Sequence, residues 1–280
     1  MARITARQPE PAAVAADAVR PREIRKYAVE AIGSFFLTFV VVMSVLSHSA
    51  FTPLAAGAAL MVMIYAGGHI SGGHYNPAVT MAALVRRKIG IVEAVGYWIA
   101  QVAGGVAAGW IARAVVNPPA VATLTLAGHA KPAAAVAELV GTFALCYVML
   151  NVATSKEQQG NGFYGLAIGF TVAAAAFAVG GVSGGVFNPQ VALGGATGGV
   201  FAWSTIWIYL VVQLGAGIIA GLAFLVLDPG DSALRTYTGG SNRISRPAGP
   251  NPVPAQRGES PSTAPAPAAT RVPSSNETGA

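Results

Sequence analysis

The sequence is short of charge. Asp, Glu, Lys and Arg make up only 10% of its 280 residues, whereas 54% are apolar and the mean hydropathy is +0.56. Soluble domains carry about 25% charged residues. This composition therefore excludes an ordinary water-soluble domain.

Cysteine and histidine are also scarce. Cys146 is the single cysteine, which excludes an intrachain disulfide, and inside an apolar run we expect it to serve packing. The four histidines form no evident cluster with Cys, Asp or Glu. We also find no phosphate-binding loop and no pair of nucleophile and base. These absences argue against an enzyme and predict neither a metal nor a cofactor.

In place of charge, the chain has a series of long apolar runs. A helix needs about 20 apolar residues to cross a hydrocarbon core of roughly 30 Å. Six candidate runs are present: Tyr27–Ser47, Pro53–Gly68, Ile91–Val115, Ala134–Ala153, Phe163–Val179 and Ala202–Leu227. We therefore predict an all-α protein that crosses the lipid bilayer several times.

The apolar runs divide the chain into three parts. We expect residues 27–227 to form the membrane domain, in two halves of about 27–115 and 134–227. Residues 1–26 and 228–280 are poor in apolar periodicity and rich in residues such as Ala and Pro. Such segments bury too little apolar surface to become ordered, so we expect both to be disordered.

The net charge of +6 does not indicate a nucleic-acid partner, because the bases flank the apolar runs. Lys and Arg beside membrane spans set topology, and the excess lies on the cytoplasmic side. If the amino terminus is inside, all bases except Arg113 and Lys131 are cytoplasmic. We interpret Arg86-Arg87-Lys88 as a topology anchor. We predict a multi-pass protein of the plasma (cytoplasmic) membrane with both termini in the cytoplasm.

A short motif, Ser-Gly-Gly-x-x-Asn-Pro, occurs at Ser71–Pro77 and again at Ser183–Pro189. The two asparagines are 112 residues apart (188 − 76). Further correspondences join Glu30 with Glu138, Tyr97 with Tyr209 and Gln101 with Gln213. Each half holds three apolar runs, an odd number. The second half must therefore insert upside down relative to the first, as in inverted-repeat transport proteins.

Each motif is followed by a short apolar run, Val79–Leu84 and Val191 to about Gly199, which cannot span the membrane. Proline suits the first position of a helix, and about ten helical residues reach half-way across the bilayer. We predict two re-entrant half-helices that meet near the midplane, one entering from the cytoplasm and one from outside. The alternative, in which each asparagine caps a surface helix, fits two matched copies poorly.

With these residues, the sequence resembles the aquaporin (major intrinsic protein) family over about residues 27–227. The resemblance rests on Gly68–Thr80, on the second Asn-Pro and on the paired glutamates. It implies six transmembrane helices plus two re-entrant half-helices in a right-handed bundle, one pore per subunit and a homotetramer. It also implies a passive channel for water and small uncharged solutes that excludes protons and ions.

The tetramer has weak support in small residues. Gly105-x-x-x-Gly109 and Gly217-x-x-x-Gly221 allow helices to approach closely. Such pairs serve contacts between subunits and packing within one subunit equally well. The sequence does not decide between these two uses.

Two sets of residues are expected around the pore. The amino termini of the half-helices carry about half a positive charge each, which repels protons and cations, and the asparagine amides can donate to a passing oxygen. We assign the pore motif to Asn76, Pro77, Ala78, Asn188, Pro189 and Gln190. The resemblance also implies pore-lining loops whose backbone carbonyls supply acceptors along one wall, at Gly72, Gly73, His74, Tyr75, Gly184, Val186 and Phe187.

The selectivity filter departs from the family pattern. Water-specific members narrow the outer pore with an aromatic residue, a histidine and an arginine, and the filter places fall here at Ala56, Ala176, Gly185 and Val191. The aspartate that marks glycerol channels is replaced by Ala192. A wide filter without arginine adds ammonia, urea, hydrogen peroxide and short polyols to water as candidate permeants.

Three questions stay open at this level. Gln190, in place of the motif's alanine, either shifts the contact of the half-helices or adds a hydrogen-bonding group to the pore. Glu30 and Glu138 either accept hydrogen bonds from the re-entrant loops, which we favour, or couple transport to protons as in a secondary transporter. The last alternative is a non-conducting scaffold whose pore is plugged by Tyr75, Phe187 or Gln190.

Overall fold

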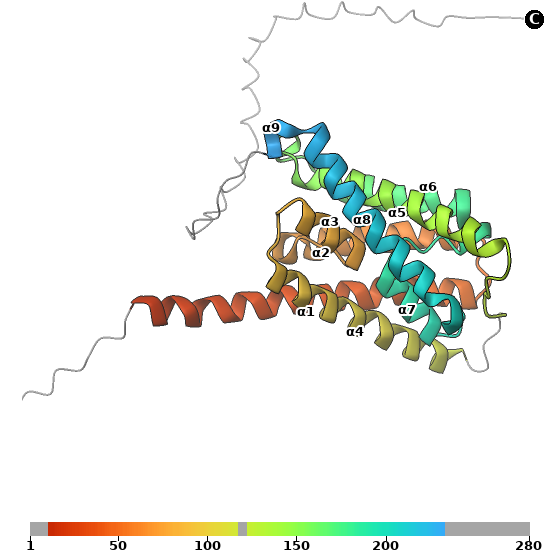
Figure 1. The fold of residues 1–280 in the computed structure, drawn as a ribbon. Helices are drawn as coiled ribbons and strands as arrows, with labels where there is room; N and C mark the ends of the chain where they lie inside the picture. The colour runs from red at the N-terminus through yellow and green to blue at the C-terminus, as the bar shows by residue number, and fades with distance from the viewer. Residues whose placement is uncertain (1–10, 117–121, 233–280) are drawn as a thin grey trace, which may run out of the picture. The chain divides into compact units, whose positions relative to one another are not determined.

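The computed structural model describes residues 11–116 and 122–232 of the chain, which are largely helical (Figure 1). The long helices are α1 (Pro11–Leu46), α2 (Thr52–Ser71), α4 (Ile91–Val115), α5 (Ala130–Thr154), α6 (Tyr164–Ser183) and α8 (Ile206–Leu227). The short helices are α3 (Pro77–Val85), α7 (Pro189–Thr197) and α9 (Pro229–Ser232), with 3-10 turns at Lys156–Gln158 and Trp203–Thr205. Within the described residues, extended backbone pairs only between Leu124 and Phe201. The fold is all-α.

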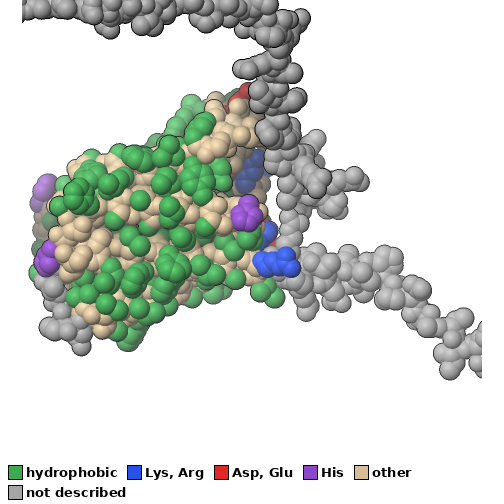
Figure 2. Space-filling model, turned by 180° about the vertical axis from the view of Figure 1, so that it is seen from behind, with side chains coloured by type: hydrophobic (Ala, Val, Ile, Leu, Met, Phe, Trp, Pro, Cys, Tyr) green, Lys and Arg blue, Asp and Glu red, His purple; other side chains and the backbone are tan. Residues whose placement is uncertain are grey.

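Six helical segments are long and apolar enough to cross a membrane, as the sequence predicts. They are Glu23–Leu46, Thr52–Ser71, Ile91–Val115, Ala130–Thr154, Tyr164–Ser183 and Trp203–Leu227. Figure 2 shows apolar side chains spread over the face in view, with Lys and Arg only toward one end of it. A face of this kind suits contact with lipid tails rather than water. The chain is a multi-pass membrane protein.

Two of the spans continue past the ends of their apolar runs. α2 extends to Ser71 and α6 to Ser183, the serines of the repeated motif. Each helix then stops at a glycine in the left-handed conformation, with φ of 91° at Gly72 and 93° at Gly184. Glycine adopts this conformation without the strain that a side chain brings. The Ser-Gly-Gly sequence therefore ends the span and begins the re-entrant loop.

The helical part is longer at both ends than the expected membrane domain. α1 begins at Pro11 rather than near residue 27, and α9 lies inside the tail that the sequence assigns to disorder. The other parts of the two expected disordered segments, residues 1–10 and 233–280, lie outside the described residues. The expected boundary at residue 27 therefore falls inside α1, whereas the one at residue 228 follows directly on the end of α8 at Leu227.

The half-helices α3 and α7 interlock the two halves of the chain. Each begins at a proline and is capped by the asparagine before it. The Asn76 side chain accepts from the N–H groups of Ala78 and Val79, and the Asn188 side chain accepts from that of Gln190. α3 packs against α8, and α7 packs against α4. Each half-helix thus rests on the third span of the opposite half.

Glycines of α4 and α8 make this close packing possible. A Cβ at Gly105 or Gly109 would collide with backbone or side-chain atoms of α7, and one at Gly217 or Gly221 with atoms of α3. The two Gly-x-x-x-Gly pairs therefore serve packing within the chain. They no longer support a contact between subunits.

A buried ion pair joins the end of α3 to α9. Arg86 is only 4% exposed, and its Nη2 donates to Oδ2 of Asp231 at 2.8 Å. The same oxygen accepts from the Lys156 N–H at 2.9 Å, and the guanidinium lies 4.1 Å from the centre of the Phe224 ring. The interpretation of Arg86 as a topology anchor missed this partner, because Asp231 is 145 residues away in a segment expected to be disordered.

Replacing Asp231 by asparagine is expected to lower thermal stability at neutral pH and to matter less in acid. Burial raises the pKa of the Asp231 carboxyl, but hydrogen bonds from Lys156 and the charges of Arg86 and Lys88 outweigh it, so the pKa lies below its ordinary value of 3.8. A depressed pKa stabilises the fold fully above the unfolded-state pKa, and this contribution is lost as pH falls through the folded-state pKa. The loss in Asp231→Asn should therefore be constant above about pH 5 and shrink below about pH 4.

Melting temperatures of the detergent-solubilised chain, measured across this pH range, test the expectation. In a chain of this size, each kcal/mol lost from the free energy of unfolding lowers the melting temperature by roughly 2–4 °C. Glu157→Gln removes an exposed carboxyl from the loop that holds Lys156 and serves as the control. If the difference in melting temperature between wild type and Asp231→Asn stayed the same in acid, the charged role of Asp231 would be refuted.

Candidate functional site

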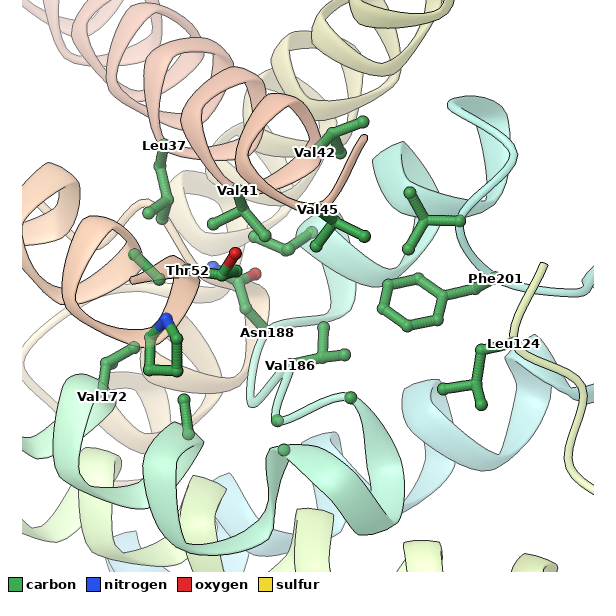
Figure 3. A pocket seen from close by; sticks show the side chains of 18 of the residues that line it. Leu37, Val41, Val42, Val45, Thr52, Leu124, Val172, Val186, Asn188 and Phe201 are labelled. Carbon is green, nitrogen blue, oxygen red and sulfur yellow. The ribbon is translucent and has the colours of Figure 1, made fainter. Parts of the chain in front are cut away.

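A cavity at one end of the bundle leads toward the point where α3 and α7 meet. It has a volume of 510 Å³ and is lined mainly by apolar side chains. Figure 3 shows Leu37, Val41 and Val45 of α1 on one side of it, Val186 on another, and Asn188 between them. We call this cavity the vestibule.

A second and much smaller cavity adjoins the vestibule. Its volume is 20 Å³, and it shares Leu60, Asn76 and Leu145 with the vestibule wall. The remaining lining residues are Ile64, Gly72, Gly73, His74, Val79, Met149, Ala153, Tyr164 and Ile168. One water molecule needs about 10–15 Å³ of such space, so this cavity, which we call the narrow segment, holds about one water. We call the two adjoining cavities together the conduit; Asn76 lines both of them and Asn188 lines the vestibule.

Asn76 and Asn188 meet at the junction of the half-helices. Nδ2 of Asn76 donates to the Phe187 carbonyl at 2.8 Å, and Nδ2 of Asn188 donates to the Tyr75 carbonyl at 2.8 Å. The oxygen of each amide caps its own half-helix. An amide has two N–H groups, so each asparagine retains one donor for a solute in the conduit.

Tyr75 and Phe187 hold the re-entrant loops in a strained conformation. Their φ angles of 45° and 50° lie in the left-handed region, which costs a residue with a side chain about 1–2 kcal/mol. The N–H of each residue donates to a buried glutamate, and the carbonyl accepts from the asparagine of the opposite half. These hydrogen bonds offset the backbone strain at the two residues whose carbonyls position the asparagines.

Glu30 and Glu138 are fully buried and accept four hydrogen bonds each. Glu30 accepts from Ser71 Oγ, the N–H groups of His74 and Tyr75, and Gln101 Nε2, at 2.6–3.0 Å. Glu138 accepts from Ser183 Oγ, the N–H groups of Val186 and Phe187, and Gln213 Nε2, at 2.7–2.9 Å. Neither carboxylate lines the vestibule or the narrow segment. This geometry fits the structural interpretation and speaks against a role in proton coupling.

Comparison with known proteins agrees with the doubled architecture. The chain matches the family described as major intrinsic protein over residues 17–224. It belongs to this family. It is 35% identical over 206 residues to Aquaporin NIP2-1 of Zea mays, covering 69% of this chain and 68% of the relative. It is 34% identical over 217 residues to Glycerol uptake facilitator protein-like 6 of Lactiplantibacillus plantarum, covering 74% of this chain and 100% of the relative.

A solved structure supports the fold alone. The X-ray structure of the aquaglyceroporin from Plasmodium falciparum covers 76% of this chain and 100% of that chain, with a TM-score of 0.64. The sequence identity of this pair is 20%. The similarity therefore concerns the arrangement of the helices rather than the lining of the conduit.

In this member of the major intrinsic protein family, the four predicted filter residues come together. Ala56, Ala176, Gly185 and Val191 all line the vestibule. Among the described residues that form its wall there is no Lys, Arg, Asp or Glu. Because the four side chains are small or apolar, this part of the wall leaves room and offers little hydrogen bonding.

Gln190 does not reach the conduit. It is fully buried, its Oε1 accepts from Thr38 Oγ1 at 2.6 Å, and its Nε2 donates to the Tyr75 carbonyl at 3.2 Å. Gly105 leaves the space that this longer side chain occupies. Gln190 therefore acts on the contacts of α7 rather than as a group in the conduit wall. The other predicted motif residues, Pro77, Ala78 and Pro189, are likewise buried and line neither cavity.

The predicted loop residues divide into two groups. The first lines the conduit: Gly72, Gly73 and His74 in the narrow segment, Gly184 and Val186 in the vestibule. The second comprises Tyr75 and Phe187, which are 1% and 0% exposed and line neither cavity. Their carbonyls, expected as acceptors in the pore wall, instead accept from Asn188 and Gln190 at Tyr75 and from Asn76 at Phe187. Because Gln190 is buried as well, none of the three side chains plugs either cavity.

The sequence interpretation missed the wall of the narrow segment. Ile64, Met149 and Ile168 line it, although they belong to no motif and carry no polar group. Apolar residues inside apolar helices give no local sign of facing a conduit. The repeat itself was the available signal, because it relates Ile168 and Ile64 to Ala56 and Ala176.

Proposed function

We propose that this chain is a passive channel that conducts water and small uncharged solutes and excludes protons and other ions. The observation that carries the proposal is the junction of two opposed half-helices, where Asn76 and Asn188 border the vestibule. Each helix terminus carries about half a positive charge, which repels cations inside the membrane. A water that accepts from both amides turns its own hydrogens away from its neighbours in the file. This orientation interrupts a chain of hydrogen bonds for protons.

Besides water, the permeants we propose are ammonia, urea, hydrogen peroxide and short polyols. The absence of Lys and Arg from the vestibule wall supports this range, because a larger or less polar solute meets neither a bulky cation nor a dense set of donors there. The relatives support it as well, since one is named an aquaporin and another a glycerol uptake facilitator.

The placement in the membrane is part of the proposal. We place the chain in the plasma membrane with both termini in the cytoplasm and the vestibule open to the outside. The bases Arg86, Arg87, Lys88 and Lys156 lie in loops at the end opposite the vestibule, and such bases favour the cytoplasmic side. A homotetramer is proposed from membership in the family.

Stopped-flow measurements on proteoliposomes of the purified chain test the proposal. We expect fast fluxes of water and urea, with a weak temperature dependence and no requirement for an ion gradient. Uptake that depends on a proton gradient and rises steeply with temperature would instead indicate a secondary transporter. No flux of any solute from a folded protein would indicate a scaffold.

Val191→Arg is expected to reduce the flux of urea more than that of water. Val191 is 3% exposed and lines the vestibule beside Gly185 and Ala176. A guanidinium there would narrow the opening and bind water tightly, so a wider solute meets the larger barrier. An added barrier of about 1.4 kcal/mol lowers a rate tenfold. We expect the urea flux to fall by about tenfold or more.

Val191→Met is the matched control, because it adds length without charge. It should reduce urea flux less than Val191→Arg does. Equal reductions of water and urea in both variants would contradict the account of a wide, arginine-free filter.

A further inference from the structure

The inverted repeat gives the four filter residues counterparts on the other side of the asparagines. A step of 112 residues leads from Ala56, Ala176, Gly185 and Val191 to Ile168, Ile64, Gly73 and Val79. All four counterparts line the narrow segment. We call the first set the vestibule ring and the second set the mirror ring.

Packing supports the equivalence of the two rings. A Cβ on Gly185 would lie 3.1 Å from the Ala176 Cα, and a Cβ on Gly73 would lie 3.4 Å from the Ile64 Cα. The φ angles of these glycines are also alike, 63° and 64°. The backbones of the rings therefore correspond, and the rings differ in the side chains that they carry.

The two rings differ in bulk, and both of their differing pairs have the larger side chain in the mirror ring. Both alanines of the vestibule ring are isoleucines in the mirror ring. Next to the rings, Met149 of α5 corresponds to Val41 of α1, by the step of 108 residues that relates Glu30 to Glu138. Val41 lines the vestibule and Met149 lines the narrow segment. In these three pairs the larger side chain lines the narrow segment, whereas the pair of Val45 and Ala153 near the ends of the two cavities has the opposite order.

The cavity volumes differ in the same direction. The vestibule measures 510 Å³, whereas the narrow segment measures 20 Å³. A solute that passes the vestibule ring freely must therefore part the isoleucines and Met149.

His74 lines the narrow segment, and its contact with Thr80 fixes which of its ring nitrogens carries the proton. Thr80 Oγ1 donates to the Asn76 carbonyl at 3.1 Å and accepts from Gln101 Nε2 at 3.0 Å. Its single proton is thereby used, so His74 Nδ1, which lies 3.1 Å away, must be the donor of the contact between them. In the neutral ring Nε2 is then an acceptor, which suits solutes that carry N–H or O–H groups.

We propose that the mirror ring is the specificity-determining constriction of this channel, with Ile64, Ile168 and Met149 setting the size limit and His74 offering the polar contact. The inference rests on the proposed channel function and narrows its permeants. Compact solutes such as water, ammonia and urea pass, whereas glycerol is held back in spite of the wide vestibule ring.

The test is the double variant Ile64→Ala, Ile168→Ala, which gives the mirror ring the side chains of the vestibule ring. Permeabilities for water, urea and glycerol are measured in proteoliposomes. Wild type should favour urea over glycerol, and the double variant should raise the ratio of glycerol to water permeability by roughly tenfold, the lower end of what one methylene contributes to discrimination in an apolar site. The control Val41→Ala, Val172→Ala truncates two apolar side chains of the vestibule wall and should leave this ratio unchanged.

The outcomes separate the inference from the function on which it rests. A wild type that conducts neither water nor urea overturns the channel itself. A conducting wild type whose ratio does not respond to the double variant, or responds equally to the control, overturns the mirror ring as the constriction. If the double variant does not fold, Ile64→Val and Ile168→Val should each raise the ratio by a smaller amount, and no rise in either variant counts against the inference.

Discussion

Glu138→Leu is expected to yield no folded channel, whereas Glu138→Gln should yield a less stable protein that still conducts. The carboxylate accepts from four donors, among them the backbone N–H groups of Val186 and Phe187. Leucine accepts none of these bonds. Each buried donor left without a partner costs about 1–3 kcal/mol, and four of them reach the scale of the whole stability of a typical domain, about 5–15 kcal/mol.

Glutamine keeps half of this arrangement. Its oxygen can accept from Ser183 and Val186 as the glutamate Oε1 does, while its NH₂ group meets Gln213 and Phe187. The Gln213 amide can turn over, because its own Oε1 has no hydrogen-bond partner among the described residues. The Phe187 N–H is then left without an acceptor, and so is the NH₂ group of the turned Gln213 amide, so two donors rather than four are unpaired, at about 1–3 kcal/mol each.

Glu30→Gln is expected to cost more than Glu138→Gln, although the two carboxylates are related by the repeat. Gln101, the counterpart of Gln213, donates to Thr80 Oγ1 at 3.0 Å as well as to Glu30. Turning its amide over would break the bond to Thr80. The corresponding place in the second half is Ala192, which forms no such bond.

The yield of monodisperse protein, its melting temperature and its water permeability in liposomes measure these effects. The expected order of stability is wild type, Glu138→Gln, Glu30→Gln, and last Glu138→Leu. A folded and conducting Glu138→Leu variant would refute the structural role of the carboxylate. Loss of transport in Glu138→Gln with unchanged stability would point to proton coupling instead.

The parts of the fold that the sequence predicted are those that the bilayer dictates. Backbone groups cannot stay unpaired in hydrocarbon, so apolar runs of sufficient length had to be helices, and the six spans were predicted almost to their ends. The doubled Asn-Pro and the two buried glutamates were recognised because polar groups inside the bilayer also need hydrogen-bond partners. Each of these residues recurs at the corresponding position of the second half, and this repetition indicated that it has a structural or functional role.

What the sequence did not predict depends on the direction of side chains. Tyr75 and Phe187 lie in the motif, yet their positive φ turns the rings into the protein and only the carbonyls toward the asparagines. The position of the Gln190 side chain depends on the space beside Gly105 and on the hydroxyl of Thr38, which lie on two other helices. Such contacts join residues far apart in the sequence. Neither the periodicity nor the composition of the sequence predicts them.

Gly141→Ala is expected to disable the channel although it adds a single methyl group. A Cβ on Gly141 would fall closer than 3.0 Å to three ring atoms of Phe187. The ring cannot move aside freely, because the Phe187 N–H donates to Glu138 and its carbonyl accepts from Asn76. Overpacking of this kind costs about 1–3 kcal/mol, and any relief displaces the carbonyl that orients Asn76.

Gly33→Ala makes the same collision with Tyr75 in the first half. Its effect should be larger, because the Tyr75 hydroxyl also donates to the Met63 carbonyl at 3.0 Å and fixes the far end of the ring. We expect both variants to melt at lower temperature and to lose about tenfold or more in water permeability per folded protein, which corresponds to about 1.4 kcal/mol. Gly181→Ala is the control, since a Cβ there meets no atom within 4 Å and alanine favours the helix.

A double variant decides whether the ring contact is the cause. Phe187→Leu alone removes ring atoms and should destabilise the chain through the space that it leaves. In combination with Gly141→Ala, part of that space accepts the new methyl group, so the two losses of stability should sum to more than the loss in the double variant. Strict additivity would show that Gly141 is needed for some reason other than the ring of Phe187, and the link from the glycine through the strained aromatic residue to Asn76 would then have to be abandoned.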